Sequence, residues 1–317
     1  MRVVSGTGPG DDGGELAALD RLAALLPAAP EGEIWIGDDA AVVDLGTLGP
    51  LLLATDLVAE GVHFDRGLST LADVGWKVLA VNVSDIVAMG GRPLRAVVAL
   101  AGASTDELDA LYRGLGEAAA AYDCPIVGGD LSAGTPGGGL VVSVAVLGTT
   151  DGRPAVLRRG ARPDDRVYVT GPLGRAAAGL RMLRADPRAS GALVEAHRRP
   201  VPRADEGLVA AGCGASAMID CSDGLGIDLD RLAKASGVGV VLDLVPVAEG
   251  ATLEEALGGG EDYELVFCAP VGVDVGEAFA ERGLTPPIEI GHAVADASVR
   301  LLEGAPLPLS GYQHRLG

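Results

Sequence analysis

The alternation of hydrophobic and polar residues predicts both strands and helices in the first half of the chain. Short runs dominated by apolar and β-branched residues predict strands at 34–45, 51–56, 95–101, 125–128 and 140–147. Leucines three or four positions apart predict a helix over 15–26, which Pro27 ends. Residues 1–13 are rich in glycine and aspartate and are predicted to be flexible.

Two polar pairs mark the starts of further helices. Thr70 is followed three residues later by Asp73, and Ser104 is followed in the same way by Glu107. In such a capping box each side chain accepts a hydrogen bond from the other residue's backbone N–H, so that free donors of the first turn are satisfied. The pattern predicts helices that run to about residue 89 and about residue 121.

The second half of the chain repeats the alternation. It predicts strands at 166–170, 217–220, 239–244, 263–269 and 287–291, and helices at 174–184, 204–212, 226–236 and 275–282. Several neighbouring strands have short or irregular connections, which favours an α+β fold over a doubly wound sheet. A length of 317 residues is typical of two domains. The turn at 151–154 and the basic cluster after it place the boundary between domains 1–150 and 151–317.

Composition limits the partners. The formal net charge of −20 argues against nucleic acid or an anionic membrane as a partner. No apolar run approaches the length of a membrane span, and the first residues lack a secretion signal pattern, so we predict a cytoplasmic protein. Cys124, Cys213, Cys221 and Cys268 form no CxxC pair and are predicted to be reduced and buried.

Five short segments place a carboxylate where an apolar stretch gives way to glycine or a small polar residue. They are Gly37-Asp38-Asp39, Thr55-Asp56, Asn82-Val83-Ser84-Asp85, Gly128-Gly129-Asp130 and Asp220-Cys221-Ser222-Asp223. Carboxylates brought together in this way repel one another unless a cation lies between them. Mg²⁺ prefers oxygen ligands and keeps positions open for phosphate oxygens. A bound cation also reverses the local potential, so an acidic protein can still take a phosphorylated substrate. The pattern predicts metal-assisted phosphate chemistry.

Each segment also has a simpler interpretation. Asp38 and Asp39 are typical of a turn in which an aspartate bonds its own backbone. Helical spacing places Lys77 and Asp85 in one row of a mostly apolar helix, and that row faces either solvent or a site. Asp223 could be a helix N-cap, although this leaves Asp220 unexplained. The N-terminus of the helix that follows would favour an anion.

Two glycine- or arginine-rich segments are weaker candidates. Arg158 and Arg159 could hold a phosphate through their guanidinium groups, or could belong to an exposed interdomain turn. The glycines at 258–260 precede Glu261 and could shape a pocket or form a plain turn. The sequence contains no Walker-A motif and no kinase His-Arg-Asp loop, so the familiar ATP-binding loops are absent.

Taken in order, these segments resemble the thiamine-monophosphate kinase family, within the aminoimidazole-ribotide-synthetase-like superfamily. The resemblance extends from residue 14 to residue 312. Its most specific parts are 37–41, 55–64, 82–91, 128–130, 219–225 and 259–265. It implies two α/β domains, with N-terminal sheets from two protomers packing into a homodimer. The first domain is expected to bind metal and ATP, and the second to complete the ATP and substrate site.

The resemblance also implies an activity and a set of site residues. The expected reaction is ATP-dependent phosphorylation of thiamine monophosphate to thiamine diphosphate, by direct in-line transfer assisted by Mg²⁺. The residues that match the family's metal ligands are Asp39, Thr55, Asp56, Asp85, Asp130, Asp220 and Asp223. Those that match its ATP site are Gly129, Asp130, Arg158 and Ser222. Those that match its substrate contacts are His63, Glu261 and Tyr312. Among these, Asp56, Asp85 and Asp220 are the predicted catalytic residues.

One departure from the family pattern concerns the first strand. Ala54 stands where the family commonly has serine, which puts one metal ligand in doubt. Two alternatives remain open: another ATP-using enzyme of the superfamily, such as an aminoimidazole ribotide synthetase, and a non-catalytic nucleotide-binding protein. The absence of cysteine from residues 1–14 argues against selenophosphate synthetase, and the ending 314–317 lacks the cysteine of the hydrogenase-maturation relative.

Overall fold

The computed structural model describes residues 51–134 and 137–312, together with Leu25, Pro27, Ala28, Pro30 and Gly46. The predicted helix at 15–26, the predicted strand at 34–45 and the candidate ligand Asp39 lie outside the described residues, apart from Leu25.

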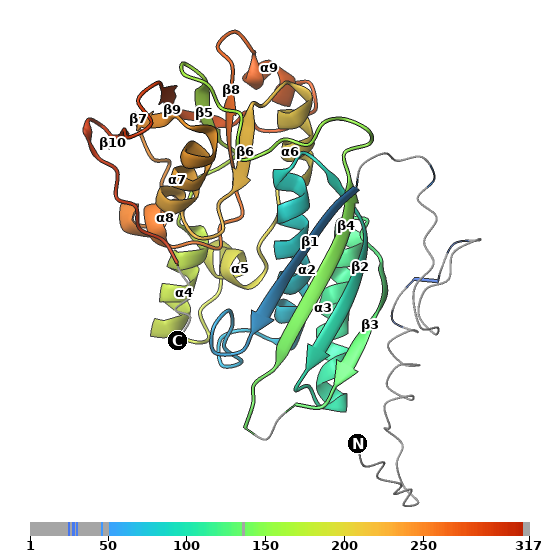
Figure 1. Cartoon of the computed structure of the whole chain (residues 1–317). Helices are drawn as coiled ribbons and strands as arrows, with labels where there is room; N and C mark the ends of the chain where they lie inside the picture. Colours follow the sequence, from blue (N-terminus) through green and yellow to red (C-terminus); the bar gives the residue numbers. More distant parts are fainter. Residues whose placement is uncertain are drawn as a thin grey trace, which may run out of the picture.

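A four-stranded sheet forms the first half of the described chain (Figure 1). Its strands are β1 (Leu51–Ala59), β2 (Arg92–Ala101), β3 (Ile126–Ser132) and β4 (Val141–Thr149), in the order β1-β4-β2-β3. Only β2 and β3 pair in parallel. The helices α2 (Leu71–Ala88) and α3 (Thr105–Ala121) belong to the same half, and α2 also contacts the second half.

The helix starts agree with the capping patterns of the sequence. Thr70 is the N-cap of α2 and forms a complete capping box with Asp73. Ser104 is the N-cap of α3 and forms the same arrangement with Glu107. Both helix predictions are therefore confirmed.

Two glycines let α2 and α3 pack with their backbones in contact. A Cβ atom on Gly114 would lie 1.8 Å from the carbonyl oxygen of Ala72, and one on Gly75 would lie 2.0 Å from that of Leu111. Any larger residue at either position would force the helices apart. Part of the chain's high glycine content therefore has a structural reason.

A seven-stranded sheet forms the second half, in the order β11-β10-β7-β9-β5-β8-β6. Its strands are β5 (Arg166–Val169), β6 (Ala217–Asp220), β7 (Gly239–Leu242), β8 (Leu265–Ala269), β9 (Ile288–Val294), β10 (Arg300–Leu302) and β11 (Ala305–Pro306). The helices are α4 (Arg175–Ala185), α5 (Ala192–Arg198), α6 (Ala204–Gly212), α7 (Leu225–Ser236), α8 (Leu253–Gly258) and α9 (Val275–Ala280). Only β7 and β10 pair in parallel in this sheet, so the α+β prediction is confirmed.

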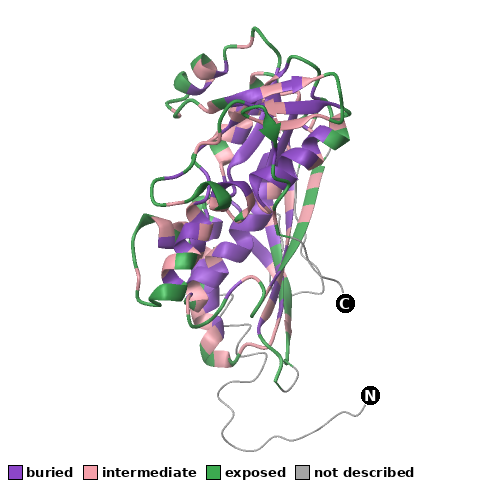
Figure 2. Cartoon of the chain, turned by 90° about the vertical axis from the view of Figure 1, so that its left-hand side faces the viewer, coloured by how far each residue is buried: buried purple, intermediate pink, exposed green. Residues whose placement is uncertain are grey.

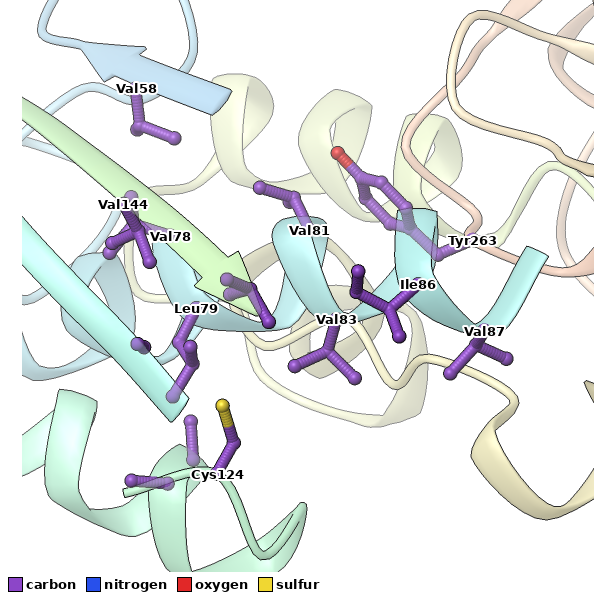
Figure 3. Close-up of a cluster of buried hydrophobic side chains, with 14 of the residues drawn as sticks. Val58, Val78, Leu79, Val81, Val83, Ile86, Val87, Cys124, Val144 and Tyr263 are labelled. Atoms are coloured by element: carbon purple, nitrogen blue, oxygen red, sulfur yellow. The ribbon is translucent and has the colours of Figure 1, made fainter. Parts of the chain in front are cut away.

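One hydrophobic core joins the two halves. It contains α2 residues such as Val81 and Ile86 together with Tyr263, Leu265 and Phe267 from the second half. Figure 3 shows Tyr263 beside α2, near Val81 and Ile86. A second core lies within the second half, around β5, β7, β8 and α7. Buried residues are concentrated where helices meet the sheets (Figure 2).

The sequence missed some elements and ended several strands too early. It did not predict α5, α8, β10 or β11, which are all seven residues or shorter. It ended the third strand at Gly128, whereas β3 continues through Asp130 to Ser132 and pairs with β2. All four cysteines are free, but Cys213 is only partly buried. No helix in the described part of the chain is long and apolar enough to cross a membrane.

Candidate active site

Helix α2 carries the residues on which the site is built. Lys77 is only 2% exposed and contacts Glu261 of the second half, so the polar row on this helix does not face solvent. Ser84 Oγ donates a hydrogen bond of 2.7 Å to Asp220 Oδ2. Asp85 lines a cavity shared with Asp220. The row of polar residues is therefore turned toward the junction of the two halves.

A buried asparagine holds Asp56 beside this helix. Asn82 Oδ1 accepts a hydrogen bond of 2.8 Å from Asp56 N, and Asn82 Nδ2 donates one of 2.8 Å to Val78 O. Asp56 lies in register with buried Val144, which places its side chain on the helix-facing side of the sheet. Both ends of the Asn82 amide are occupied, so the position of this part of β1 is fixed relative to α2.

Two segments of the second half are joined next to Asp220. Strand β6 ends at Asp220, which pairs with Leu265 at the start of β8. Beyond this pair, the backbone of residues 221–222 exchanges three hydrogen bonds of 2.7–3.0 Å with that of residues 261–264. The Asp220–Asp223 segment and the glycine-rich loop before Tyr263 therefore form one surface, although they are far apart in the sequence.

The three predicted catalytic carboxylates lie within electrostatic range of one another. Burial, and then the charges of Asp220 and Asp56, raise the pKa of Asp85 to about 7. Burial is also the main cause of the raised pKa of Asp220 and of Asp56. Arg158 acts in the opposite direction and lowers the pKa of Asp85 and of Asp220. The site thus concentrates negative potential that one arginine offsets only in part.

A cavity of about 530 Å³ opens beside these carboxylates. Its apolar walls come from β1, α2, β6 and the segment that links the two halves. The charged residues that line it are Asp85, Asp220, Arg158 and Arg159. A mainly apolar cavity with a few charged groups on one side is typical of a site for a nucleotide or another small molecule.

Asp223 has a different environment from the other acids. Arg231 donates a hydrogen bond to Asp223 Oδ2 and a second one, of 2.8 Å, to Asp228 Oδ1. Asp228 Oδ2 accepts hydrogen bonds from the N–H groups of Asp223 and Gly224, at 2.9 Å and 3.0 Å. The N-cap of α7 is Gly224, so the interpretation of Asp223 as the N-cap is wrong. The helix N-terminus was predicted to favour an anion, but Asp228 already accepts hydrogen bonds from two N–H groups beside it.

Asp130 is not brought to the other acids within one chain. It lies on β3, at the edge of the sheet opposite β1. Asp130 is in register with Ala99, and both are exposed on the face that points away from α2. Gly129 belongs to the same strand, and a Cβ atom there would lie 1.8 Å from Val98 O. Thr55 lies on the same outer face as Asp130, and its Oγ1 donates a hydrogen bond of 2.9 Å to Val144 O.

The three predicted substrate contacts are linked to different parts of the acidic site. His63 follows β1, its Nδ1 accepts a hydrogen bond of 3.0 Å from Ala59 N, and its imidazole is close enough to Asp56 to lower the pKa of that carboxyl. Tyr312 N donates a hydrogen bond of 3.0 Å to Asp223 O. Glu261 N donates one of 2.7 Å to the carbonyl oxygen of Ser222, a predicted ATP contact. Each of these three residues is therefore linked to a part of the acidic site.

The oxygen donors of the site suit a divalent cation. Among the residues that the structure describes, no group of three His, Cys, Asp or Glu side chains is already arranged to hold a metal ion. The charge of Asp56 nevertheless raises the pKa of Asp85 and of Asp220, and the charge of Asp220 raises that of Asp85, as expected of carboxylates that lie close together. An all-oxygen set of this kind suits Mg²⁺ and not a softer metal.

Some residues of the site had no assigned role at the level of sequence. Ser84 stands directly before Asp85, and helical spacing could have placed it on the side of α2 that faces Asp220. Arg231 stands three residues after Asp228, the spacing of neighbours on a helix surface. No sequence signal connects Lys77 or His197 with Glu261, because those contacts depend on the packing of the two halves.

Comparison with known proteins agrees with this architecture. Residues 37–150 match the N-terminal domain of AIR synthase related proteins, and residues 162–303 match their C-terminal domain. The chain is 37% identical over 262 residues to thiamine-monophosphate kinase from Rhodopirellula baltica, covering 75% of this chain and 77% of that protein.

Solved structures extend the similarity. The crystal structure of thiamine-monophosphate kinase from Stenotrophomonas maltophilia has a TM-score of 0.79 and 31% identity, covering 91% of this chain and 96% of that one. AaThiL complexed with AMPPCP and TMP has a TM-score of 0.75 and 32% identity, covering 98% of this chain and 100% of that one. The fold and the matched domains thus define an AIR synthase related protein. Within that class, the chain belongs to the thiamine-monophosphate kinase family.

Proposed function

We propose that this chain transfers the γ-phosphoryl group of ATP to thiamine monophosphate, giving thiamine diphosphate and ADP. Membership of the family supports this reaction. So does the placement of Asp85, Asp220 and Arg158 around one cavity, which is the observation that carries the proposal. The acceptor is a phosphate oxygen that is already deprotonated near neutral pH, so no strong general base is needed. A site made of carboxylates and arginine agrees with that requirement.

Each group of residues has a separate part in this mechanism. Asp56, Asp85 and Asp220, with Asp39 and Asp223, would hold Mg²⁺. The bound ions would neutralise the charge that develops between the entering and leaving oxygens. Arg158 lies beside Asp85 and Asp220 and would contact the ATP phosphates, together with Ser222. His63, Glu261 and Tyr312 would bind thiamine monophosphate on the side of the 221–224 segment. In-line transfer then depends on positioning and charge neutralisation.

We propose further that the active protein is a homodimer. The outer face of the four-stranded sheet exposes Leu53 at 78%, Leu57 at 52% and Val97 at 41%. An apolar face of this kind favours packing against a second sheet. A two-fold axis along the strands places β3 of one copy over β1 of the other, which brings Asp130 near Thr55 across the interface. The predicted Asp130 ligand would then serve the site of the neighbouring copy.

A coupled assay of ADP release tests the reaction. Thiamine monophosphate with ATP and Mg²⁺ is expected to give steady turnover, because all three are needed to complete the site. Thiamine and an aminoimidazole ribotide precursor are the comparison substrates. Turnover with the aminoimidazole precursor alone would favour an aminoimidazole ribotide synthetase. Nucleotide binding without turnover on any substrate would favour a non-catalytic protein.

Mixing two inactive variants tests whether Asp130 acts across the dimer. Asp130→Asn and Asp85→Asn are each expected to be inactive, and random exchange of subunits makes half of the dimers mixed. In a mixed dimer one site has both aspartates and the other has neither, so about a quarter of wild-type turnover should return. Mixing Asp85→Asn with Asp220→Asn is the control, since both residues belong to one chain's site, and no activity should return. If the first mixture also stays inactive, Asp130 does not act in the partner's site.

The location in the cytoplasm is a further part of the proposal. It rests on the intracellular supply of ATP, the proposed co-substrate.

A further inference from the structure

A buried lysine pairs with the predicted substrate residue Glu261. Lys77 Nζ lies 3.2 Å from Glu261 Oε1 and 3.1 Å from Glu261 Oε2. The Lys77 side chain is 3% exposed, whereas that of Glu261 is 29% exposed. The Glu261 side chain is therefore held against the lysine while part of it stays accessible. Lys77 comes from α2 and Glu261 from the second half, so the contact crosses the junction of the two halves.

A buried histidine lies on the same carboxylate. His197 is 5% exposed, and its Nδ1 is 3.5 Å from Glu261 Oε2. In the described part of the chain this nitrogen makes no hydrogen bond, which is uncommon for a buried polar atom. Burial, and then the charge of Lys77, lower the pKa of His197, so the imidazole is neutral near pH 7. A small movement of the carboxylate would complete this bond.

The segment that carries His197 is fixed to the first half of the chain. Arg198 Nε donates a hydrogen bond of 2.7 Å to Leu68 O, and Arg199 Nε donates one of 2.6 Å to Asp73 Oδ1. Trp76 Nε1 donates one of 2.8 Å to Pro200 O. These three contacts attach residues 198–200 to the start of α2 and to the loop before it. His197 is consequently held in place independently of Glu261.

The backbone at Glu261 is strained. Glu261 has a φ of +58° and Tyr263 a φ of +52°, in the left-handed region that non-glycine residues rarely adopt. Such strain persists only where surrounding contacts fix it, and it is concentrated at functional sites. Here the contacts are the backbone bonds to residues 221–222 and the side-chain pair with Lys77.

We propose that Lys77 and His197 are positioning residues for the thiamine-phosphate site, which orient the Glu261 carboxylate so that its accessible side meets the substrate. This inference rests on the proposed function. It assigns a role to two residues that lie behind the predicted contact and do not touch the substrate themselves. It also gives a reason for a buried ion pair where a well-packed apolar pair would be equally stable.

Electrostatics supports the arrangement. Burial by itself disfavours the charge on Glu261, but this is outweighed, first of all by the charge of Lys77, and the pKa of Glu261 is lowered to about 2. The carboxylate is therefore ionised throughout the range in which the enzyme would work. Without Lys77, burial would no longer be offset, and Glu261 would turn toward solvent or bind a proton more readily.

The test is a kinetic comparison of the chain's two lysines. Lys77→Met is expected to raise the KM for thiamine monophosphate by about 10-fold to 100-fold, the usual effect of losing a charged hydrogen bond. The KM for ATP should stay within about threefold, because Arg158 and the metal ligands are unchanged. Lys77→Arg should recover part of the loss, since the positive charge is kept. Lys234→Met is the matched control, because Lys234 is 70% exposed and pairs with Asp230 and not with Glu261.

A double-mutant cycle separates positioning from folding. If Lys77 acts through Glu261, then Lys77→Met added to Glu261→Gln should change the KM for thiamine monophosphate little further. Additive effects, or equal rises in both KM values, would overturn the inference and indicate a structural role. His197→Gln provides a second test if Lys77→Met folds poorly. It should raise the KM for thiamine monophosphate by a smaller factor and leave the KM for ATP unchanged. If the variants raise both KM values equally, the positioning role is wrong but the proposed reaction is unaffected. If the wild-type protein shows no turnover, both the positioning role and the proposed reaction are wrong.

Discussion

Replacing Asp85 by asparagine is expected to reduce turnover by about 10²-fold to 10³-fold, the usual effect of removing one preorganised electrostatic group. Asp85 lines the cavity with Asp220 and Arg158, and the charges of Asp220 and Asp56 act on it. The change keeps the size of the side chain but removes the negative charge that Mg²⁺ would need. Steady-state ADP release at saturating Mg²⁺ measures the effect.

The same substitution should stabilise the metal-free protein. The pKa of Asp85 is raised from 3.8 to about 7 in the folded state, so the folded state binds the proton more tightly than the unfolded state. This favourable contribution is complete below about pH 4 and is lost as the pH rises to about 7. At pH 8 in EDTA, the free energy of unfolding of Asp85→Asn should therefore exceed that of the wild type by about 4 kcal/mol, and at pH 4 the two should differ little.

The control for Asp85→Asn is Asp106→Asn, at an exposed position in the first turn of α3. It should change neither turnover nor the pH dependence of unfolding. Near-normal turnover of Asp85→Asn at saturating Mg²⁺ would show that Asp85 has no part in the reaction. A loss of turnover together with a loss of stability would indicate damage to the fold.

The second large effect concerns stability. Replacing Arg203 by alanine is expected to lower the free energy of unfolding by about 3–5 kcal/mol, because its partner Glu264 would remain as an unpaired buried charge. Arg203 Nε donates a hydrogen bond of 2.8 Å to Glu264 Oε2, and a second guanidinium nitrogen bonds Oε1. Glu264 is 1% exposed and also accepts a hydrogen bond of 2.6 Å from Thr170 Oγ1. Urea denaturation measures the change, provided that the slope with urea stays constant.

A surface pair of the same chemistry is the matched control. Arg181 bonds both carboxylate oxygens of Glu255, but its side chain is 53% exposed. Arg181→Ala should therefore have a much smaller effect on the free energy of unfolding than Arg203→Ala. Adding Glu264→Gln to Arg203→Ala should recover part of the loss, because the unpaired charge is removed. Equal effects at Arg203 and Arg181 would show that burial of Glu264 is energetically unimportant.

Local signals in the sequence predicted most of the elements. The capping boxes at Thr70 and Ser104 involve residues three positions apart, so their geometry does not depend on the rest of the fold. The predicted end of β3 was wrong because glycine has a low intrinsic preference for strands. In the fold, Gly129 is needed inside β3, since any side chain there would meet the backbone of β2.

The partners of the site residues could not be predicted in the same way. Helical spacing placed Lys77 and Asp85 in one row, but only the packing of the second half turned that row away from solvent. Asp56 and Asp130 have similar local sequences, yet strand order and side-chain alternation place them at opposite edges and on opposite faces of the sheet. Such differences come from long-range pairing.

The amino-acid sequence by itself determined the element types, the mixed α/β class and the list of acidic segments, because these depend on side-chain chemistry and short-range hydrogen bonds. The tertiary structure decided which acids meet. Ser84 bonds Asp220 across 136 positions of the chain, and Lys77 reaches Glu261 across 184. Contacts of that range form only when two separately patterned halves share one hydrophobic core, so no local pattern could specify them.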